Sequence, residues 1–236
     1  MAFTITVADM IINARQRANM ENTNFVTDAE VVNYIDRAWR ELYDLITTEG
    51  SSNMYFLSQA TLNITSGTDS YALPTDFYKL KGIDLPIDTN APITLMPFNF
   101  NERNRGKNSF FNINATRIYR YMLAGNYVKF IPIPQTTVAA NLWYVPVPPK
   151  LVAGAPGAGE ANSIDSVNGW DEYITTDAAI QMLAKEESDT TNLRADKQER
   201  KELIIASCVN RDEGFPQHVT DISSLAAIYP FSQWLQ

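Results

Sequence analysis

Hydrophobic residues recur at helical spacing in four stretches of the 236-residue chain, two near its start and two in its second half. The strongest pattern lies between Val31 and Ile46, where apolar side chains recur every three or four residues. It follows Thr27-Asp28-Ala29-Glu30, in which the Thr27 hydroxyl can accept from the Glu30 amide while the Glu30 carboxylate accepts from the Thr27 amide. We therefore predict a helix that begins beside this capping box and ends before Gly50.

Three further helices are predicted from the same periodicity. One covers residues 7–19, one begins at Trp170, and one follows the cap residues Asp189-Thr190-Thr191 and runs to about Cys208. The apolar positions that we expect to face the core in these helices are Val7, Met10, Ile11, Ala14 and Ala18, then Trp170, Ile174, Ala178 and Met182, then Leu193, Leu203 and Ile204.

Between residues 55 and 144 the pattern changes to short segments rich in β-branched and aromatic residues, separated by turn signals. The clearest hairpin joins residues 117–123 to 127–133 through Gly125-Asn126, because glycine takes the positive φ that a type II′ turn requires first. Residues 146–169 are predicted to be a loop. The other predicted strands cover residues 59–64, 71–74, 77–85, 93–95 and 140–145.

The order of helices, strands and helices predicts an α+β fold. Residues 1–50 and 170–214 are expected to form one discontinuous helical bundle domain of about four helices, built from both chain ends. Residues 51–169 are expected to form an inserted antiparallel β-sandwich or barrel-like domain. Residues 215–236 follow both as a separate segment, which we call the C-terminal arm.

The C-terminal arm is unusually apolar for a chain end, since Asp221 is its only acidic side chain and it has no Lys or Arg. Burial of each large apolar side chain would contribute about 1.5–3 kcal/mol, so the arm is expected to be covered. It could pack onto its own helical domain, or it could extend into a groove on another subunit or another protein. Its two prolines favour the second alternative. The predicted partner-binding residues are Phe215, Ile222, Leu225, Ile228, Tyr229, Phe231, Trp234 and Leu235.

Composition narrows the chemistry further, because the chain holds one histidine and one cysteine. No disulfide can form within it, and no zinc site with several histidine or cysteine ligands can be assembled. Cys208 is expected to serve packing rather than reactivity. Residues 154–159 are rich in glycine, but Glu160-Ala161 stands where a phosphate-binding loop needs Lys and Ser or Thr. We therefore expect no enzyme, no cofactor and no metal.

The formal net charge of −8 argues against a protein that mainly grips nucleic-acid backbones. Residues 1–50 hold 8 acidic and 4 basic side chains, and residues 170–214 hold 11 and 6, whereas residues 51–169 hold 7 and 9. The negative charge therefore resides in the predicted helices. No apolar run approaches the ~20 residues of a membrane helix, and residues 1–6 lack the features of a signal peptide, so we expect neither membrane insertion nor export.

One basic cluster with interleaved aromatic residues is a candidate for contact with an acidic surface or nucleic acid. The alternative is that it forms an ordinary solvated loop and strand face. Its basic members are Arg103, Arg105, Lys107, Arg117 and Arg120, and its aromatic members are Phe98, Phe100, Phe110, Phe111 and Tyr119.

Several motifs together resemble the head-to-tail adaptor proteins of tailed bacteriophages, over roughly residues 7–210. The second helix follows the pattern D-x-E-x-x-x-x-I-x-x-A-x-x-E-L-Y from Asp28. The other matching segments are Tyr71-Ala72-Leu73-Pro74-Thr75-Asp76-Phe77, Ile131-Pro132-Ile133-Pro134, Leu142-Trp143-Tyr144-Val145-Pro146, and Gly169-Trp170-Asp171-Glu172-Tyr173 through Lys185-Glu186-Glu187-Ser188-Asp189.

The resemblance implies a virion structural protein that forms a ring of twelve copies between the portal and the tail, or nozzle, proteins. It implies that a helical domain touches the portal, that an inserted β domain faces outward or towards the tail, and that genome DNA passes through without sequence-specific binding. An acidic lumen would keep the duplex from adhering. The alternative function is a tail-associated receptor- or carbohydrate-binding module, which would expose aromatic and Asn or Asp side chains at loop tips.

Overall fold

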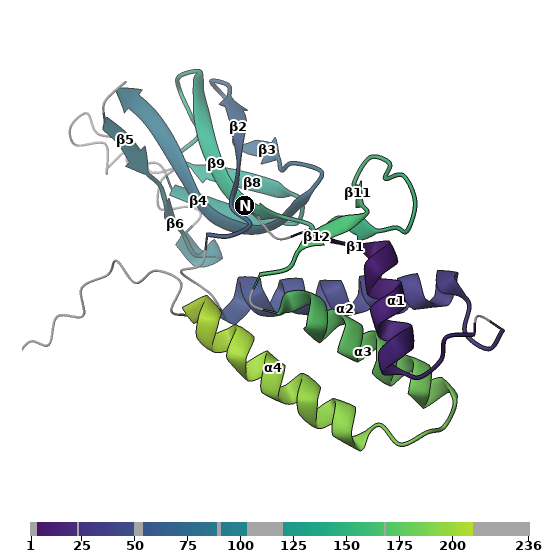
Figure 1. The fold of residues 1–236 in the computed structure, drawn as a ribbon. Helices are drawn as coiled ribbons and strands as arrows, with labels where there is room; N and C mark the ends of the chain where they lie inside the picture. The colour runs from purple at the N-terminus through teal and green to yellow at the C-terminus, as the bar shows by residue number, and fades with distance from the viewer. Residues whose placement is uncertain are drawn as a thin grey trace, which may run out of the picture.

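The structure is a computed structural model, and it describes residues 4–22, 24–49, 54–88, 91–102, 120–167 and 169–209. Within these ranges the fold combines four α-helices with several, mainly antiparallel, sheets, which confirms the predicted α+β class (Figure 1). The C-terminal arm lies outside the described residues, as does Gly50.

The four helices are α1 (Val7–Arg17), α2 (Asp28–Glu49), α3 (Trp170–Lys185) and α4 (Thr191–Val209), so the structure confirms all four predicted helices. Side chains cap three of their starts, and the capping box of Thr27 and Glu30 at the start of α2 is one of them. The Thr6 hydroxyl accepts from the backbone amide of Asp9 at 3.1 Å, and the Asp189 carboxylate accepts from the amide of Thr191 at 2.9 Å. Each such cap stabilises a helix by about 1 kcal/mol, which explains why these helices begin where the sequence predicts.

Helix α3 lies among the other three helices and packs against all of them (Figure 1). Its predicted apolar positions are buried, but burial extends to its polar side as well, where Thr175, Thr176 and Asp177 are buried too. The Thr176 hydroxyl donates to the carbonyl of Glu172 at 2.6 Å, so its polar group is not left without a partner. Helix α3 is therefore the central helix of the group rather than a helix with one buried stripe.

Helix α4 corrects one prediction, because Leu203 is 64% exposed and does not face the core. Its neighbour Ile204 is 1% exposed, as predicted, and Cys208 is also buried in the core. Helix α4 packs against α2 and α3 from one side, and consecutive residues of a helix point about 100° apart. The narrow buried stripe of α4 therefore includes Ile204 and leaves Leu203 at the surface.

Most strands belong to two four-stranded sheets. The first has the order β2 (Ser58–Ile64), β9 (Val138–Pro146), β4 (Phe77–Asp88), β5 (Ala91–Thr94), with antiparallel pairs throughout. The second has the order β3 (Ser70–Ala72), β8 (Tyr127–Ile131), β7 (Arg120–Ala124), β6 (Met96–Pro97), in which only β6 and β7 are parallel. A short 3-10 helix, η1 (Phe100–Glu102), follows β6.

The predicted hairpin is confirmed in β7 and β8, where Ala124 pairs with Tyr127 across the two-residue loop Gly125-Asn126. The φ of Gly125 is 59°, whereas the φ of Asn126 is not positive, as a type II′ turn requires. A side chain at Gly125 would be strained in this conformation. The turn therefore sets the register of the whole hairpin.

The stretch 146–169 is not only a loop as predicted, because it holds three short strands. Strand β12 (Ser163–Asp165) pairs antiparallel with β1 (Thr4–Thr6), and β10 (Lys150–Leu151) pairs in parallel with β11 (Glu160–Ala161). Each strand has two or three residues and a partner far away in the chain or across a loop, so local periodicity could not reveal it.

The buried side chains form two hydrophobic clusters. One contains the helices together with Ile5, Val145, Leu151 and Ile164, and the other contains residues from both four-stranded sheets. Strand segments from 145 to 164 thus contribute to the helical cluster. The division into a helical domain of residues 1–50 and 170–214 and an inserted β domain of residues 51–169 stays a prediction.

A polar network joins α2, α3 and α4 on one side of the helical cluster. The Lys197 ammonium donates to Asp177 at 2.9 Å and to Glu41 at 3.0 Å, and the Tyr173 hydroxyl donates to Glu41 at 2.8 Å. Burial alone would lower the pKa of Lys197, but its hydrogen bonds to Asp177 and Glu41 outweigh burial and raise that pKa. The network therefore keeps a charged lysine against the otherwise buried Asp177.

We expect Lys197→Met to lower the free energy of unfolding by about 2 kcal/mol, because it leaves the carboxylate of Asp177, 6% exposed, without its ion pair. Urea denaturation followed by circular dichroism measures the change. Lys150→Met, at an exposed lysine of β10, is the matched control and should change stability by less than about 0.5 kcal/mol. Equal effects of the two substitutions would contradict a structural role for the network.

Candidate functional site

Among the described residues, no group of three or more His, Cys, Asp or Glu side chains is placed to hold a metal ion. Cys208 is 4% exposed and belongs to the helical core, in agreement with a packing role. The candidate functional features of the described chain are instead surfaces that could contact other proteins: an ordered loop at one end of the helices, a pocket between helices and strands, and exposed apolar side chains.

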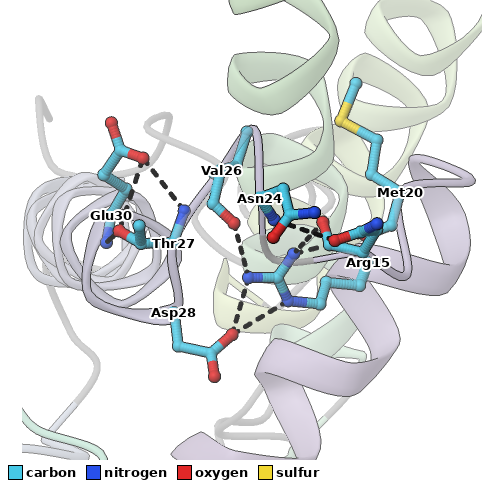
Figure 2. A network of polar contacts seen from close by, with 8 residues as sticks. Arg15, Met20, Asn24, Val26, Thr27, Asp28 and Glu30 are labelled. Carbon is cyan, nitrogen blue, oxygen red and sulfur yellow. Dashed lines mark hydrogen bonds and ion pairs between the residues drawn. The ribbon is translucent and has the colours of Figure 1, made fainter.

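The loop between α1 and α2 is held from within by Arg15, whose guanidinium is aimed into it (Figure 2). Arg15 is 6% exposed, and its Nε and Nη2 atoms donate to Asp28 at 3.0 and 2.6 Å. Nη2 also donates to the carbonyl of Val26 at 2.7 Å, while Nη1 reaches the carbonyls of Met20 and Asn22 at 3.3 and 3.4 Å. One charged side chain therefore satisfies three loop carbonyls and a carboxylate.

The capping box that the sequence predicts completes this loop at the start of α2 (Figure 2). The Thr27 amide donates to Glu30 at 3.0 Å, and the Glu30 amide donates to the Thr27 hydroxyl at 3.3 Å. Lys185 of α3 also donates to Glu30 at 2.7 Å. The hydrogen bond from Lys185, followed by that from the Thr27 amide, lowers the pKa of Glu30.

These contacts hold an apolar side chain at the surface of the loop. Phe25 is 52% exposed, its carbonyl accepts from Lys185 at 3.1 Å, and the Lys185 ammonium lies 5.2 Å from the centre of its ring. An aromatic side chain on a loop whose backbone is fixed loses little further freedom on binding. We therefore call residues 18–22 and 24–27, which include Phe25, the α1–α2 loop surface and treat it as a candidate contact site.

Neither Arg15 nor Phe25 was among the predicted site residues. The sequence does indicate that Arg15 is buried, because it stands within the apolar stripe of α1, four residues after Ile11 and three before Ala18. An arginine on a buried helix face must find several acceptors. The identity of those acceptors depends on the path of the loop, which the sequence does not specify.

A pocket of about 410 Å³ lies where the helices meet the strands. Its walls are mainly aromatic, with the rings of Tyr43 and Phe56 4.3 Å apart and those of Tyr55 and Trp170 4.9 Å apart between centroids. We call it the junction pocket and define it by six of its lining residues, Trp39, Tyr43, Tyr55, Phe56, Val147 and Trp170.

Two tyrosine hydroxyls of the junction pocket are hydrogen-bonded to neighbouring groups. The Tyr55 hydroxyl donates to Asp165 at 2.5 Å, and the Tyr43 hydroxyl donates to the carbonyl of Pro146 at 2.7 Å. Burial raises the pKa of Tyr43, so this hydroxyl remains protonated. The indole nitrogens of Trp39 and Trp170 are buried and have no hydrogen-bond partner within the described structure.

The predicted basic cluster is described only in part. Arg120 begins β7 and is exposed, whereas Arg103, Arg105, Lys107 and Arg117 lie outside the described residues. Of the aromatic members, Phe100 is 60% exposed, but Phe98 is 7% exposed and belongs to the core. Phe98 is therefore not a surface aromatic. Phe110, Phe111 and Tyr119 lie outside the described residues, as do all eight predicted partner-binding residues of the C-terminal arm.

The chain matches the family model of the SU10 adaptor protein over residues 5–207, and it therefore belongs to the SU10 adaptor protein family. This match agrees with the resemblance to bacteriophage adaptors and favours a structural role over catalysis. No curated protein matches the chain. Among the helices of the described ranges, none combines the length and apolarity that a membrane crossing requires.

We expect Arg15→Met to lower the free energy of unfolding by about 2–3 kcal/mol, because it leaves loop carbonyls and a carboxylate without a charged donor. Hydrogen exchange of residues 18–27 should become faster, while exchange in the centre of α3 changes no more than global stability requires. Arg37→Met, at an exposed arginine of α2, is the matched control. Unchanged exchange in the loop would show that Arg15 does not hold it.

The lowered pKa of Glu30 means that folding favours its carboxylate form, so its contribution to stability is present above about pH 4.5. That contribution is lost as the pH falls through the lower pKa of the folded state. We therefore expect Glu30→Gln to flatten the loss of stability on acidification below pH 4.5, measured by urea denaturation at successive pH values. Glu21→Gln, at an exposed position in the same loop, should leave the loss of stability below pH 4.5 as it is in the wild-type chain.

Proposed function

We propose that this protein is a virion structural protein, the head-to-tail adaptor that joins the portal to the tail of a bacteriophage. The observation that carries the proposal is the family match over residues 5–207, which covers the described helices and strands except Thr4 of β1 and the last two residues of α4. The finer architecture is part of the proposal: a helical bundle from both chain ends, an inserted β-sandwich or barrel-like domain, and the C-terminal arm.

We propose that copies of the chain form a ring of twelve, with the helical part against the portal and the strands towards the tail. The α1–α2 loop surface supports this orientation, because it presents Phe25 at one end of the helices on a backbone fixed by Arg15 and Lys185. A prearranged apolar contact of this kind suits assembly with a large partner.

The charge distribution supports a passage for DNA through the ring. Residues 1–50 and 170–214 hold most of the acidic side chains, and the net charge of the chain is −8. An acidic lumen repels the phosphate backbone, so genome DNA would pass without sequence-specific binding. The protein acts in the virion after assembly in the host cytoplasm, without catalysis, cofactor or metal.

The proposal also gives a partner to the C-terminal arm and to the basic cluster, which lie wholly or mostly outside the described residues. The C-terminal arm docks outside its own chain, on the portal or on a neighbouring subunit, through the predicted partner-binding residues. The basic cluster, of which Arg120 is described, contacts an acidic surface of a tail component.

One observation favours the alternative of a receptor- or carbohydrate-binding module. Tyr127 is 50% exposed and follows Asn126 at the tip of the β7–β8 hairpin, where a binding module would present such side chains. A trimer that is indifferent to the portal would support this alternative.

The test is co-assembly of the purified chain with the portal of the same phage, followed by native mass spectrometry. We expect a co-complex with twelve copies of the chain. Phe25→Asp should weaken this complex at least tenfold, because it places a charge at the proposed contact, whereas Tyr127→Asp, at an equally exposed residue of the strands, should not. If the portal does not bind, or if only Tyr127→Asp weakens binding, the proposal fails.

A further inference from the structure

We infer that the junction pocket receives the C-terminal arm of a second copy of this chain. The inference deepens the proposed function and rests on it, because a ring brings the arm of one copy next to the pocket of another. It assigns the arm a binding site and assigns the pocket an occupant.

The pocket has the size and the lining of a peptide-binding site. Its volume of about 410 Å³ lies within the usual range for ligand pockets, about 300–1,000 Å³, and is enough for a few side chains. Trp39, Tyr43, Tyr55, Phe56 and Trp170 provide aromatic walls of the kind that hold extended segments containing proline.

The pocket favours an apolar occupant without acidic side chains. Its one carboxylate, Asp165, accepts from the Tyr55 hydroxyl at 2.5 Å, and a neutral hydroxyl does not neutralise a carboxylate, so Asp165 disfavours Asp and Glu in the occupant. Trp39 and Trp170, which are 4% and 2% exposed, line the pocket, but their indole N–H groups are enclosed by the fold and take no part in the contact.

The C-terminal arm has the matching chemistry. Residues 222–236 contain no Asp, Glu, Lys or Arg, and they end in Tyr229-Pro230-Phe231 and Trp234-Leu235. Aromatic side chains dominate the energy of such contacts, and Pro230 removes one backbone donor that would otherwise have to be satisfied. The aromatic end of the arm is therefore the part that enters the pocket.

The length of the chain after α4 allows the arm to reach a second copy. Helix α4 ends at Val209, and residues of β12 line the pocket (Figure 1). When extended, the 27 residues after Val209 span up to ~90 Å. A folded chain of 236 residues has a radius of gyration of about 18 Å. The arm can therefore reach the pocket of an adjacent copy.

The test uses the purified full-length chain without portal, followed by sedimentation velocity over a range of concentrations. We expect the wild-type chain to associate. Val147→Lys places a charge at the pocket rim, where Val147 is 43% exposed, and should weaken association at least tenfold. Ile133→Lys, at a residue that is 40% exposed and outside the pocket lining, is the matched control and should leave association unchanged.

The decisive measurement is a mixture of two full-length variants. Phe231→Ala/Trp234→Ala damages the arm and leaves the pocket intact, whereas Val147→Lys does the reverse. Each variant alone should associate poorly, but the mixture should form mixed pairs, because one supplies the arm and the other the pocket. A peptide of residues 222–236 should also dissociate wild-type assemblies, while the same residues in scrambled order should not, and this result does not depend on the folding of any variant.

A wild-type chain that stays monomeric, an absence of mixed pairs, an inactive peptide, or equal effects of Val147→Lys and Ile133→Lys would each overturn the inference. These outcomes are separate from failure of the proposed function, because no portal is present. A chain that joins the portal but forms no mixed pairs would retain the proposed function and lose only this site.

Discussion

The burial of α3 among the other helices is the constraint on which the rest of the described fold depends. A helix covered on several sides must find partners for its polar groups, and α3 carries Thr176 and Asp177 at buried positions. Lys197 of α4 donates hydrogen bonds to Asp177 and to Glu41 of α2. One network therefore sets the positions of three helices. Because α1 and α2 precede strands β2 to β12 in the chain and α3 and α4 follow them, this packing joins segments more than 100 residues apart.

Arg15, at the end of the helices, is another buried polar side chain that requires hydrogen-bond partners. A guanidinium on a buried face needs several acceptors, and the carbonyls of the α1–α2 loop supply them. The loop is fixed as a consequence, and Phe25 becomes an exposed aromatic side chain on a rigid backbone. The stability of the loop and the exposure of Phe25 therefore arise from the same contacts.

The junction pocket arises from the way in which strands and helices meet. Val145, Leu151 and Ile164 pack into the helical cluster, and the segments beside them stand against Trp39 and Trp170 without filling the space between. A pocket lined by aromatic side chains and one carboxylate, Asp165, complements residues 222–236, which are rich in aromatic residues and contain no acidic side chain. This complementarity relates the composition of the last residues to the geometry of the described fold.

The sequence by itself determined the elements whose physics is local: the capping box of Thr27 and Glu30, the turn at Gly125, the periodicity of four helices, and hence the α+β class. Only the tertiary structure decided that β12 pairs with β1 and that Leu203 faces outward beside buried Ile204. The same holds for the burial of Phe98, a predicted member of the aromatic and basic cluster. The tertiary structure also decided the partners of Arg15 and the existence of the junction pocket. Caps, turns and periodicity depend on residues a few positions apart, whereas burial, acceptors and cavities depend on segments brought together from distant parts of the chain.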